Sequence, residues 1–191
     1  MKLFMSIVLL FIFSLAAKCQ LDKGTWLIGG FGNFTSTKDS YESLGNFPDN
    51  KFTTIKISPD IGYFLVDKFS GGLRISYSLD KLQVLTPGGS NGSIKRFEFG
   101  PFARYYFLEK DKQVNILTEV SYQYGLYYAK PTKGSINSFS FLAGPVIYFN
   151  TSVALEFLLG YYSRIEDVTS QYRDSRKAFQ IALGFQFHLK N

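Results

Sequence analysis

The sequence contains a single cysteine and a single histidine. One cysteine cannot build an internal disulfide framework, and one residue of each kind leaves too few ligands for an ordinary zinc cluster. Charged residues make up only 19% of the 191 positions and hydrophobic residues 46%, which excludes a disordered acidic or basic protein. The net charge of +6 is scattered, without a basic patch interleaved with aromatic residues, so we expect no nucleic-acid partner.

The sequence also gives little support for catalysis. No G-x-S-x-G elbow lies near His188 along the chain, and we expect this histidine to be a solvated residue at the rim of the fold. Gly29, Gly30 and Gly32 are not followed by the Lys-Ser/Thr of a phosphate loop, so we interpret them as packing positions. We therefore predict that the protein is not an enzyme and has no cofactor or metal site.

Residues 1–19 are predicted to be a signal peptide. Lys2 precedes the uncharged stretch LFMSIVLLFIFSLAA, which is shorter than the roughly 20 apolar residues of a transmembrane helix. Ala17 and Cys19 place small residues three and one positions before a cleavage point at Gln20. The alternative is that Cys19 is the lipidated cysteine of a bacterial lipoprotein, which Lys18 fits poorly. In either case we expect an exported protein whose domain spans residues 20–191.

Beyond the signal peptide, apolar and polar residues alternate with a period of two in seven segments. Their apolar phases hold 41 positions and no charged residue, whereas about eight charges would be expected at the average density of the chain. Strands near ten residues long with one uncharged face match a transmembrane barrel better than a soluble sandwich. The opposite phase carries Lys56, Asp60, Arg74, Glu98, Arg104, Glu119 and Glu156.

An internal repeat supports the pairing of these strands. Pro59, Pro101 and Pro145 lie 42 and 44 residues apart, about the length of two membrane strands with a turn and a loop. Each proline predicts a bulge or a missing ladder bond near the periplasmic rim, and a short polar turn follows each. With a first strand near 25–34, the count is eight strands.

The predicted extracellular loops are 35–50, 80–93, 129–136 and 165–176. The predicted periplasmic aromatic girdle is Tyr63, Tyr105, Phe107 and Phe149.

Three phrases carry a resemblance to a known family: SPDIGYFLVDKFSGGLRISYS, GPFARYYF and GPVIYFNTSVALEF. They resemble small outer-membrane β-barrel proteins, which include OmpX-like barrels and the membrane domain of OmpA-like proteins, over about residues 24–191. The resemblance implies a Gram-negative outer membrane, surrounding lipid and the barrel-assembly machinery as a partner during biogenesis. The predicted fold class is all-β, an eight-stranded antiparallel up-and-down transmembrane β-barrel.

The predicted function follows from the barrel interior. Eight strands enclose just enough space for side chains, and charges buried there must pair. We therefore expect a plugged, non-enzymatic barrel that serves envelope integrity or binds a ligand or surface through its loops. A narrow porin-like channel is disfavoured by the plug, and a soluble lipocalin-like carrier is disfavoured because charges fall on its inward phase. The acids expected to pair with Lys56, Arg74 or Arg104 are Glu98, Glu119 and Glu156.

Overall fold

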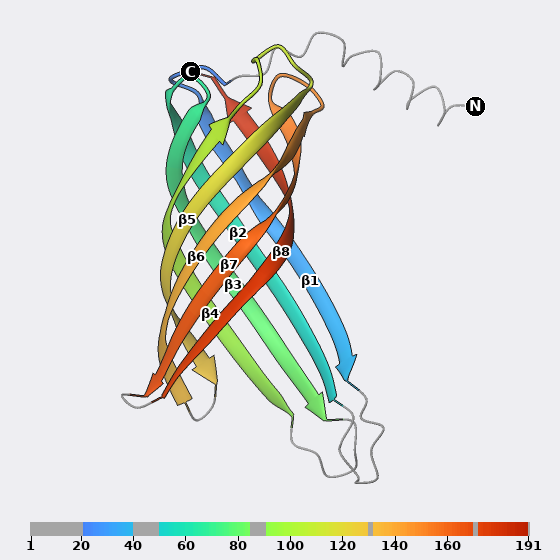
Figure 1. Ribbon diagram of the computed structural model, residues 1–191, viewed down its shortest axis with the longest axis vertical. Helices are drawn as coiled ribbons and strands as arrows, with labels where there is room; N and C mark the ends of the chain where they lie inside the picture. Colours follow the sequence, from blue (N-terminus) through green and yellow to red (C-terminus); the bar gives the residue numbers. More distant parts are fainter. Residues whose placement is uncertain (1–20, 40–49, 85–90, 130–131, 170–171, 191) are drawn as a thin grey trace, which may run out of the picture.

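The computed structural model describes residues 21–39, 50–84, 91–129, 132–169 and 172–190. The predicted signal peptide and its cleavage point at Cys19 and Gln20 lie outside these residues. Eight antiparallel strands follow one another around a closed barrel in chain order (Figure 1). They are β1 (Trp26–Asp39), β2 (Asn50–Val66), β3 (Phe69–Val84), β4 (Gly92–Tyr106), β5 (Val114–Ala129), β6 (Thr132–Tyr148), β7 (Val153–Thr169) and β8 (Tyr172–Leu189). The predicted all-β, up-and-down architecture is confirmed, and within the described residues no helix is long and apolar enough to cross a membrane.

The alternation of side chains sets the two faces of each strand. In β5 the odd-numbered residues, such as Leu117 and Glu119, are buried inside the barrel, whereas Ile116, Val120 and Tyr122 are exposed on its outside. Successive side chains of a strand point to opposite faces, so one parity faces the lumen along the whole strand. The polarity is reversed relative to a soluble protein, because the charged residues lie inside and the apolar residues outside.

The strands are longer than the sequence pattern predicted, at 14 to 18 residues. Residues 129–136 and 165–176, expected to be loops, lie mainly in strands, and the pairs Ala129↔Thr132 and Thr169↔Tyr172 close their hairpins. Residues 35–39, 50, 80–84 and 92–93 are strand as well, whereas 40–49 and 85–90 lie outside the described residues. The assignment of 129–136 and 165–176 as loops was wrong because backbone pairing between antiparallel strands does not require apolar side chains, so the paired strands continue where the apolar alternation fades.

Each of the three prolines interrupts the pairing between two strands but leaves the register of that pair unchanged. Between β2 and β3, the pairing lapses after Ile57↔Tyr77 and resumes at Asp60↔Arg74 in the same register. The same two-residue lapse occurs at Pro101 between β4 and β5 and at Pro145 between β6 and β7. Because proline has no N–H to donate, a ladder bond is missing at each position, and no bulge is formed there.

Short connections and both ends of the described chain gather at one end of the barrel, at the top of Figure 1. We call this the turn end, and the opposite end, where β3 ends at Val84 and β4 begins at Gly92, the hairpin end. Leu21 is fully buried across the turn end, and its carbonyl accepts a hydrogen bond from the backbone N–H of Lys68 at 2.9 Å. Residues just before β1 therefore cover this end of the lumen.

His188 lies under this cover, which corrects the expectation of a solvated rim residue. Its side chain is fully buried, and Nε2 lies 2.8 Å from Oε1 of Gln186. The rings of Phe64 and Tyr148 each lie 5.6 Å from the imidazole ring, centroid to centroid. His188 lies near the end of β8, at the rim as expected, but the chain segment that excludes water from it was not foreseen.

Ion pairs tie the turns at this end together. Nζ of Lys110 lies 2.5 Å from Oδ1 of Asp22 and 2.6 Å from Oδ2 of Asp67. The hydrogen bond from Lys110, followed by that from the backbone N–H of Lys23, lowers the pKa of Asp67 below its ordinary value. A lowered folded-state pKa contributes stability above the pKa of the unfolded chain, and this contribution is lost as the pH falls through the folded-state pKa.

Replacing Lys110 by alanine should raise the pKa of Asp67 toward its ordinary value, because the largest cause of the lowering is removed. The stability that Asp67 contributes above its unfolded-state pKa, and that is lost on acidification, should then shrink. Carboxyl-carbon chemical shifts of Asp67 recorded against pH measure the first effect directly. Lys112→Ala, at an exposed position in the same turn, is the matched control. An identical Asp67 titration in the Lys110 and Lys112 variants would contradict the assignment.

Candidate functional site

Two arginines and three acids form a network inside the barrel. Arg74 contacts Asp60 through Nη2 at 2.7 Å and Glu119 through Nη1 at 2.6 Å. Arg104 contacts Glu119 through Nε at 2.7 Å, Asp60 through Nη2 at 3.0 Å and Glu156 through Nη1 at 3.4 Å. All five side chains are buried. We call these five residues the lumen network.

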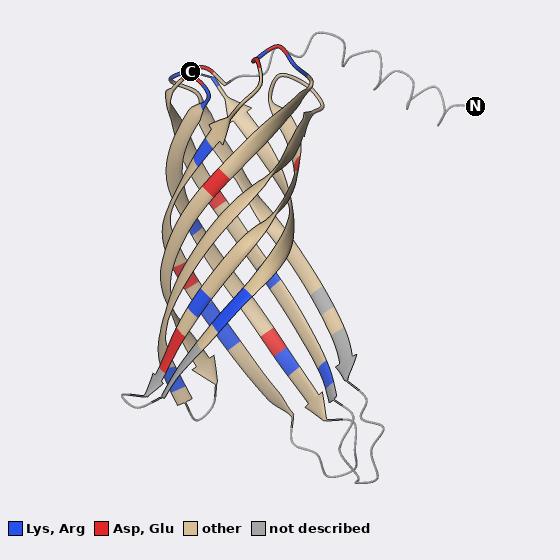
Figure 2. Ribbon diagram, in the orientation of Figure 1, with Lys and Arg blue, Asp and Glu red and all other residues tan. Residues whose placement is uncertain are grey.

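Strand register brings these charges together. Asp60 of β2 lies directly opposite Arg74 of β3, and Arg104 of β4 lies directly opposite Glu119 of β5. Figure 2 shows acidic and basic positions on the strands themselves as well as at the turns. Glu119 accepts two hydrogen bonds from Arg74, at 2.6 and 2.7 Å, and this bidentate geometry is the strong form of an arginine–carboxylate pair.

Two phenylalanine rings enclose the arginines. The guanidinium carbon of Arg74 lies 4.6 Å from the centroid of Phe31 and 5.1 Å from that of Phe102. For Arg104 the corresponding distances are 5.6 and 4.7 Å. Cation–π contact of this kind is strongest when water is excluded. Phe31 was missed in the sequence because the glycines of the first strand left its inward phase ambiguous.

Glycines make room for this packing. Gly72 lies opposite Phe102 in the β3–β4 register, and a Cβ atom on Gly72 would lie 2.6 Å from Cζ of that ring and 2.2 Å from the carbonyl oxygen of Ile61. A Cβ atom on Gly29 would lie 3.1 Å from Oδ1 of Asp60. These close approaches explain why the two wall positions carry no side chain.

Two of the predicted lumen charges lie outside the network. Glu98 is buried, and one of its carboxylate oxygens accepts a hydrogen bond from the hydroxyl of Ser138. The ammonium of Lys56 lies 5.4 Å from the ring centroid of Tyr162. Among the described residues neither Glu98 nor Lys56 has an ion-pair partner within 4 Å, so the structure does not bring these two charges into direct contact.

A second set of ion pairs lies toward the hairpin end. Arg96 is buried and contacts Glu166 through Nε at 2.8 Å and Asp80 through Nη1. Arg164 contacts the same oxygen of Glu166 at 2.9 Å. This set was not predicted from the sequence because Asp80 and Glu166 were assigned to loops. Arg96 immediately precedes the outward-facing Phe97, so the alternation along the strand predicts that Arg96 faces the lumen. This position could have indicated the second set of ion pairs.

The aromatic residues expected at the periplasmic rim lie at the turn end. Tyr105, Phe107 and Phe149 are exposed on the outer face, and Tyr63 is partly exposed. The ring centroids of Tyr105 and Phe107 lie 5.0 Å apart, and Trp26 packs edge-on against Tyr63 at 5.1 Å. Trp26 thus extends the set beyond the residues named from the sequence.

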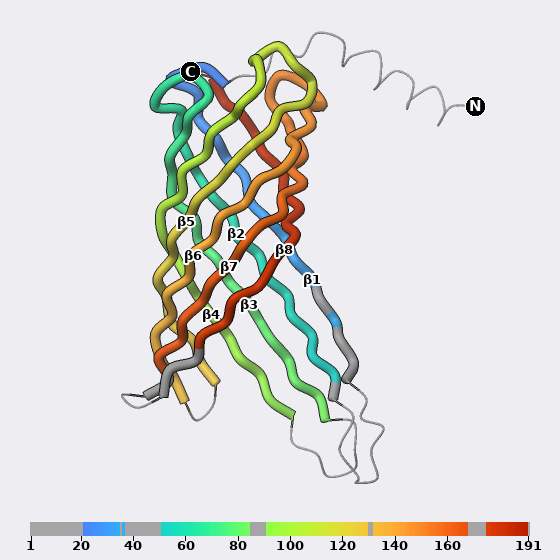
Figure 3. Tube along the Cα trace, in the orientation of Figure 1, coloured from blue at the N-terminus to red at the C-terminus, as the bar shows by residue number. Residues whose placement is uncertain are grey.

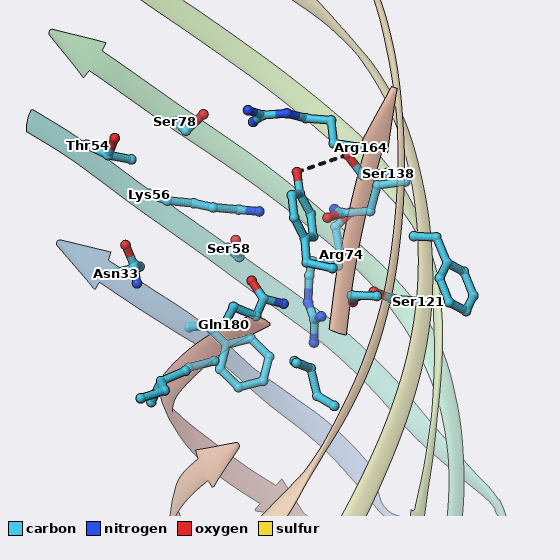
Figure 4. A pocket seen from close by; sticks show the side chains of 18 of the residues that line it. Asn33, Thr54, Lys56, Ser58, Arg74, Ser78, Ser121, Ser138, Arg164 and Gln180 are labelled. Atoms are coloured by element: carbon cyan, nitrogen blue, oxygen red, sulfur yellow. Dashed lines mark hydrogen bonds between the residues drawn. The ribbon is translucent and has the colours of Figure 1, made fainter. Parts of the chain in front are cut away.

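A cavity of about 550 Å³ lies between the lumen network and the hairpin end. Figure 4 shows Lys56 extending from β2 into this space. Arg74 and Arg164 also line it, and the only acid among its lining residues is Asp80, which is bound to Arg96. Hydroxyl groups supply much of the remaining wall, from Thr54, Ser58, Ser78, Ser121, Ser138 and Ser140. The cavity can therefore hold a polar or anionic group.

Around His188 the described residues Gln186, Phe64, Tyr106 and Tyr148 form no catalytic constellation. Residues 88–92 read Gly-Gly-Ser-Asn-Gly, which has the spacing of a nucleophile elbow. Residues 85–90, which include the serine of this pattern, lie outside the described part of the chain, and Gly92 begins β4. His188 is at the turn end of β8. Among the described residues no group of three or more His, Cys, Asp or Glu side chains could hold a metal ion.

Comparisons with known proteins give matches among solved structures alone. No protein-family model and no curated protein sequence matches the chain. The fold is similar to the crystal structure of Neisserial surface protein A (NspA), with 15% identity and a TM-score of 0.49 over 86% of this chain and 97% of that chain. It is also similar to the N-terminal β-barrel domain of Pseudomonas aeruginosa OprF, with 14% identity and a TM-score of 0.38 over 87% of this chain and 98% of that chain.

Proposed function

We propose that the protein is a non-enzymatic outer-membrane β-barrel with a plugged lumen. The observation that carries this proposal is the reversed polarity of the barrel wall. Large apolar side chains are exposed on all eight strands, whereas Arg96, Glu98, Arg104 and Glu119 are each 1% exposed inside. In water, exposed apolar surface costs about 25 cal/mol per Å². In lipid the same surface is well solvated, and a closed barrel leaves its paired backbone groups satisfied.

The turn end is proposed to face the periplasm and the hairpin end the outside. Outer-membrane barrels typically have short turns on the periplasmic side and longer extracellular connections, and the longest separation between consecutive strands, from Asp39 to Asn50, lies at the hairpin end. We propose that the hairpin end serves envelope integrity or binds an extracellular ligand or surface, and that the barrel-assembly machinery inserts the chain. The proposed binding regions are the hairpin ends within 35–50, 80–93, 129–136 and 165–176, of which the last two lie mainly in strands.

The channel alternative is disfavoured by the lumen. The lumen network joins β2, β3, β4, β5 and β7 across the interior. The turn end is filled as well, by Leu21, Phe64, Tyr106 and Tyr148, all fully buried. A lipocalin-like carrier needs an apolar cavity for its ligand, whereas Lys56, Arg74, Arg164 and several hydroxyl groups are among the residues that line this cavity.

The proposal predicts that the protein fractionates with outer membranes and migrates differently in gels before and after boiling, because a closed barrel resists detergent until it is heated. A sample unfolded in urea and left unboiled serves as the control and should migrate like the boiled protein. In planar bilayers the folded protein should give no stable conductance steps. Recovery in the soluble periplasmic fraction would contradict the membrane assignment, and stable currents would favour the channel.

A further inference from the structure

Lysines occupy the outer face of the barrel at the hairpin end. Successive side chains of a strand alternate between the two faces of the wall, and five lysines share the outward phase with the exposed apolar residues of their strands. All five are exposed. We call them the lysine belt: Lys51 of β2, Lys81 of β3, Lys95 of β4, Lys133 of β6 and Lys177 of β8. Figure 2 shows basic positions on the strands toward this end.

Strand register places the belt lysines close to one another. Lys51 and Lys81 are diagonal neighbours across the β2–β3 pair, and so are Lys81 and Lys95 across the β3–β4 pair. Diagonal neighbours of this kind are about 7–8 Å apart. Tyr128 of β5 lies directly opposite both Lys95 and Lys133. Figure 3 shows β2, β3 and β4 running side by side toward the hairpin end, so these lysines form a continuous band of positive charge.

The described residues give the belt lysines no ion-pair partner. None of the five has a carboxylate oxygen of a described residue within 4 Å. The described acid that shares their outward phase is Asp167 of β7, and it lies directly opposite Arg173 rather than opposite a belt lysine. At the turn end the lysines are paired instead, as Lys68 is with Glu109 at 3.2 Å. The two ends of the outer face therefore differ in their available positive charge.

The belt begins where the apolar surface of the outer face ends. Lys95 is two residues from Phe97 on the same face, and Lys177 is two residues from Phe179. These two rings are 47% and 87% exposed. A lysine beside an apolar surface lays its methylene stem along that surface and keeps its ammonium group in a polar layer. With the apolar surface in hydrocarbon, the belt ammonium groups lie at the level of the lipid headgroups.

The distribution of the belt around the barrel identifies its partner. The five lysines lie on β2, β3, β4, β6 and β8 of a closed ring of eight strands, so they face in different directions. A protein or a nucleic acid that docks on one side would contact only part of the belt, whereas a lipid leaflet surrounds the barrel and contacts all of it.

We propose that the lysine belt binds the phosphate groups of anionic lipids in the leaflet that surrounds the hairpin end. Exposed lysines next to an anionic lipid surface attract its headgroups, and the attraction adds up over the residues that reach the surface. The proposed orientation makes this the outer leaflet. The inference rests on the proposed membrane location and names the lipid chemistry that the hairpin end selects.

The test compares the two ends of the barrel by tryptophan fluorescence in lipid vesicles. Trp26, the only tryptophan, is 40% exposed at the turn end, so the wild-type protein reports on that end. For the hairpin end, Tyr128→Trp is combined with Trp26→Phe. Phosphatidylcholine vesicles contain the same minor fraction of either phosphatidic acid or phosphatidylcholine with brominated acyl chains, which quench tryptophan on contact. The brominated lipid is present in both leaflets, so the direction of insertion does not affect the comparison.

At position 128 the brominated phosphatidic acid should quench about threefold more strongly than the brominated phosphatidylcholine, a preference of about 0.7 kcal/mol. At Trp26 the two lipids should quench equally, because lysines at the turn end are paired with acids. Added salt should weaken the preference at position 128, since it screens exposed charges. This last measurement needs no lysine substitution and so does not depend on the folding of such a variant.

Two pairs of substitutions assign the preference to the belt. Lys95→Gln together with Lys133→Gln removes the two lysines opposite position 128 and should abolish the preference there. Lys95→Arg together with Lys133→Arg keeps both charges and should retain it. Lys112→Gln, at an exposed position in a turn at the other end, is the matched control and should leave the preference unchanged.

Equal quenching by the two lipids at position 128 would overturn the proposal. An equal preference for phosphatidic acid at Trp26 would overturn it too, because the attraction would then belong to the net charge of the whole protein. Retention of the preference in the double glutamine variant would exclude the belt as its source. If neither lipid quenches either tryptophan, the membrane location itself is wrong, and that result is distinct from quenching without a headgroup preference.

Discussion

Replacing Arg104 by alanine is expected to lower the free energy of unfolding by about 3–5 kcal/mol, the range for leaving a buried charge without its partner. Arg104 contacts Asp60, Glu119 and Glu156 and is itself fully buried. Without it, three buried carboxylates would share the single guanidinium of Arg74. Denaturant titration of the protein folded in lipid vesicles measures the loss. Lys95→Ala, at an exposed position on the same strand, should change stability by less than about 0.5 kcal/mol.

A second substitution separates electrostatics from packing. If the cost arises from uncompensated charge, Glu156→Gln should restore part of the stability lost in the Arg104→Ala variant, because one buried negative charge is removed. If the cost arises only from the cavity left by the side chain, Glu156→Gln should have no restoring effect. Full stability of Arg104→Ala, together with stable ion currents through the wild-type protein, would contradict a plugged lumen.

The alternation in the sequence predicts which face of its strand each charged residue occupies. It does not predict which charged residues pair with one another. An uncharged phase on one side of each strand is sufficient to place Arg74, Arg104 and Glu119 on the other side. Which charges meet depends on the register between strands, and Asp60↔Arg74 and Arg104↔Glu119 are adjacent only because of that register. Lys56 and Glu98 both face the lumen and yet form no direct pair, so a shared face is not sufficient to predict an ion pair.

The ends of the strands were harder to predict than their middles. Near the hairpin end the residues are polar on both faces, so the alternation that marks a half-buried strand fades while the backbone pairing continues. This is why Arg96, Asp80 and Glu166 were not recognised as a set. At the turn end, the burial of His188 depends on Leu21, which lies before the first strand and belongs to no periodic pattern.

The position where β1 leaves β8, beyond Gly32↔Leu183, could not have been inferred from β8 alone. Phe179 and Ile181 continue the outward apolar phase that includes Leu183 and Phe185, and nothing in the pattern marks the position where the neighbouring strand departs. The barrel closes where its first strand pairs with its last strand. This pairing therefore depends on the tilt and stagger of all eight strands together. The up-and-down barrel predicted from the sequence requires the first and last strands to pair, and they do so over the seven positions nearest the turn end.

Replacing Phe157 by arginine is expected to lower the free energy of unfolding in lipid by about 2–4 kcal/mol, the cost of a cation at the midplane on the lipid face of a barrel. Phe157 is 39% exposed on the outer face of β7. It is the central member of the five uncharged outward positions 153, 155, 157, 159 and 161, which places it near the middle of the apolar band. In a water-soluble barrel the same surface change would alter stability by less than about 0.5 kcal/mol.

The difference between these two magnitudes makes the substitution decisive for the environment of the barrel. Phe157→Leu keeps the position apolar and is the matched control for lost aromatic packing, so the comparison of arginine with leucine isolates the charge. Folding titrations of both variants should be run in phosphatidylcholine vesicles, where the penalty is expected. The cost of arginine should also shrink toward the rim, as in Phe149→Arg, because a long cationic side chain there reaches the headgroups. Equal stability of the arginine and leucine variants at position 157 would mean that this face does not contact hydrocarbon.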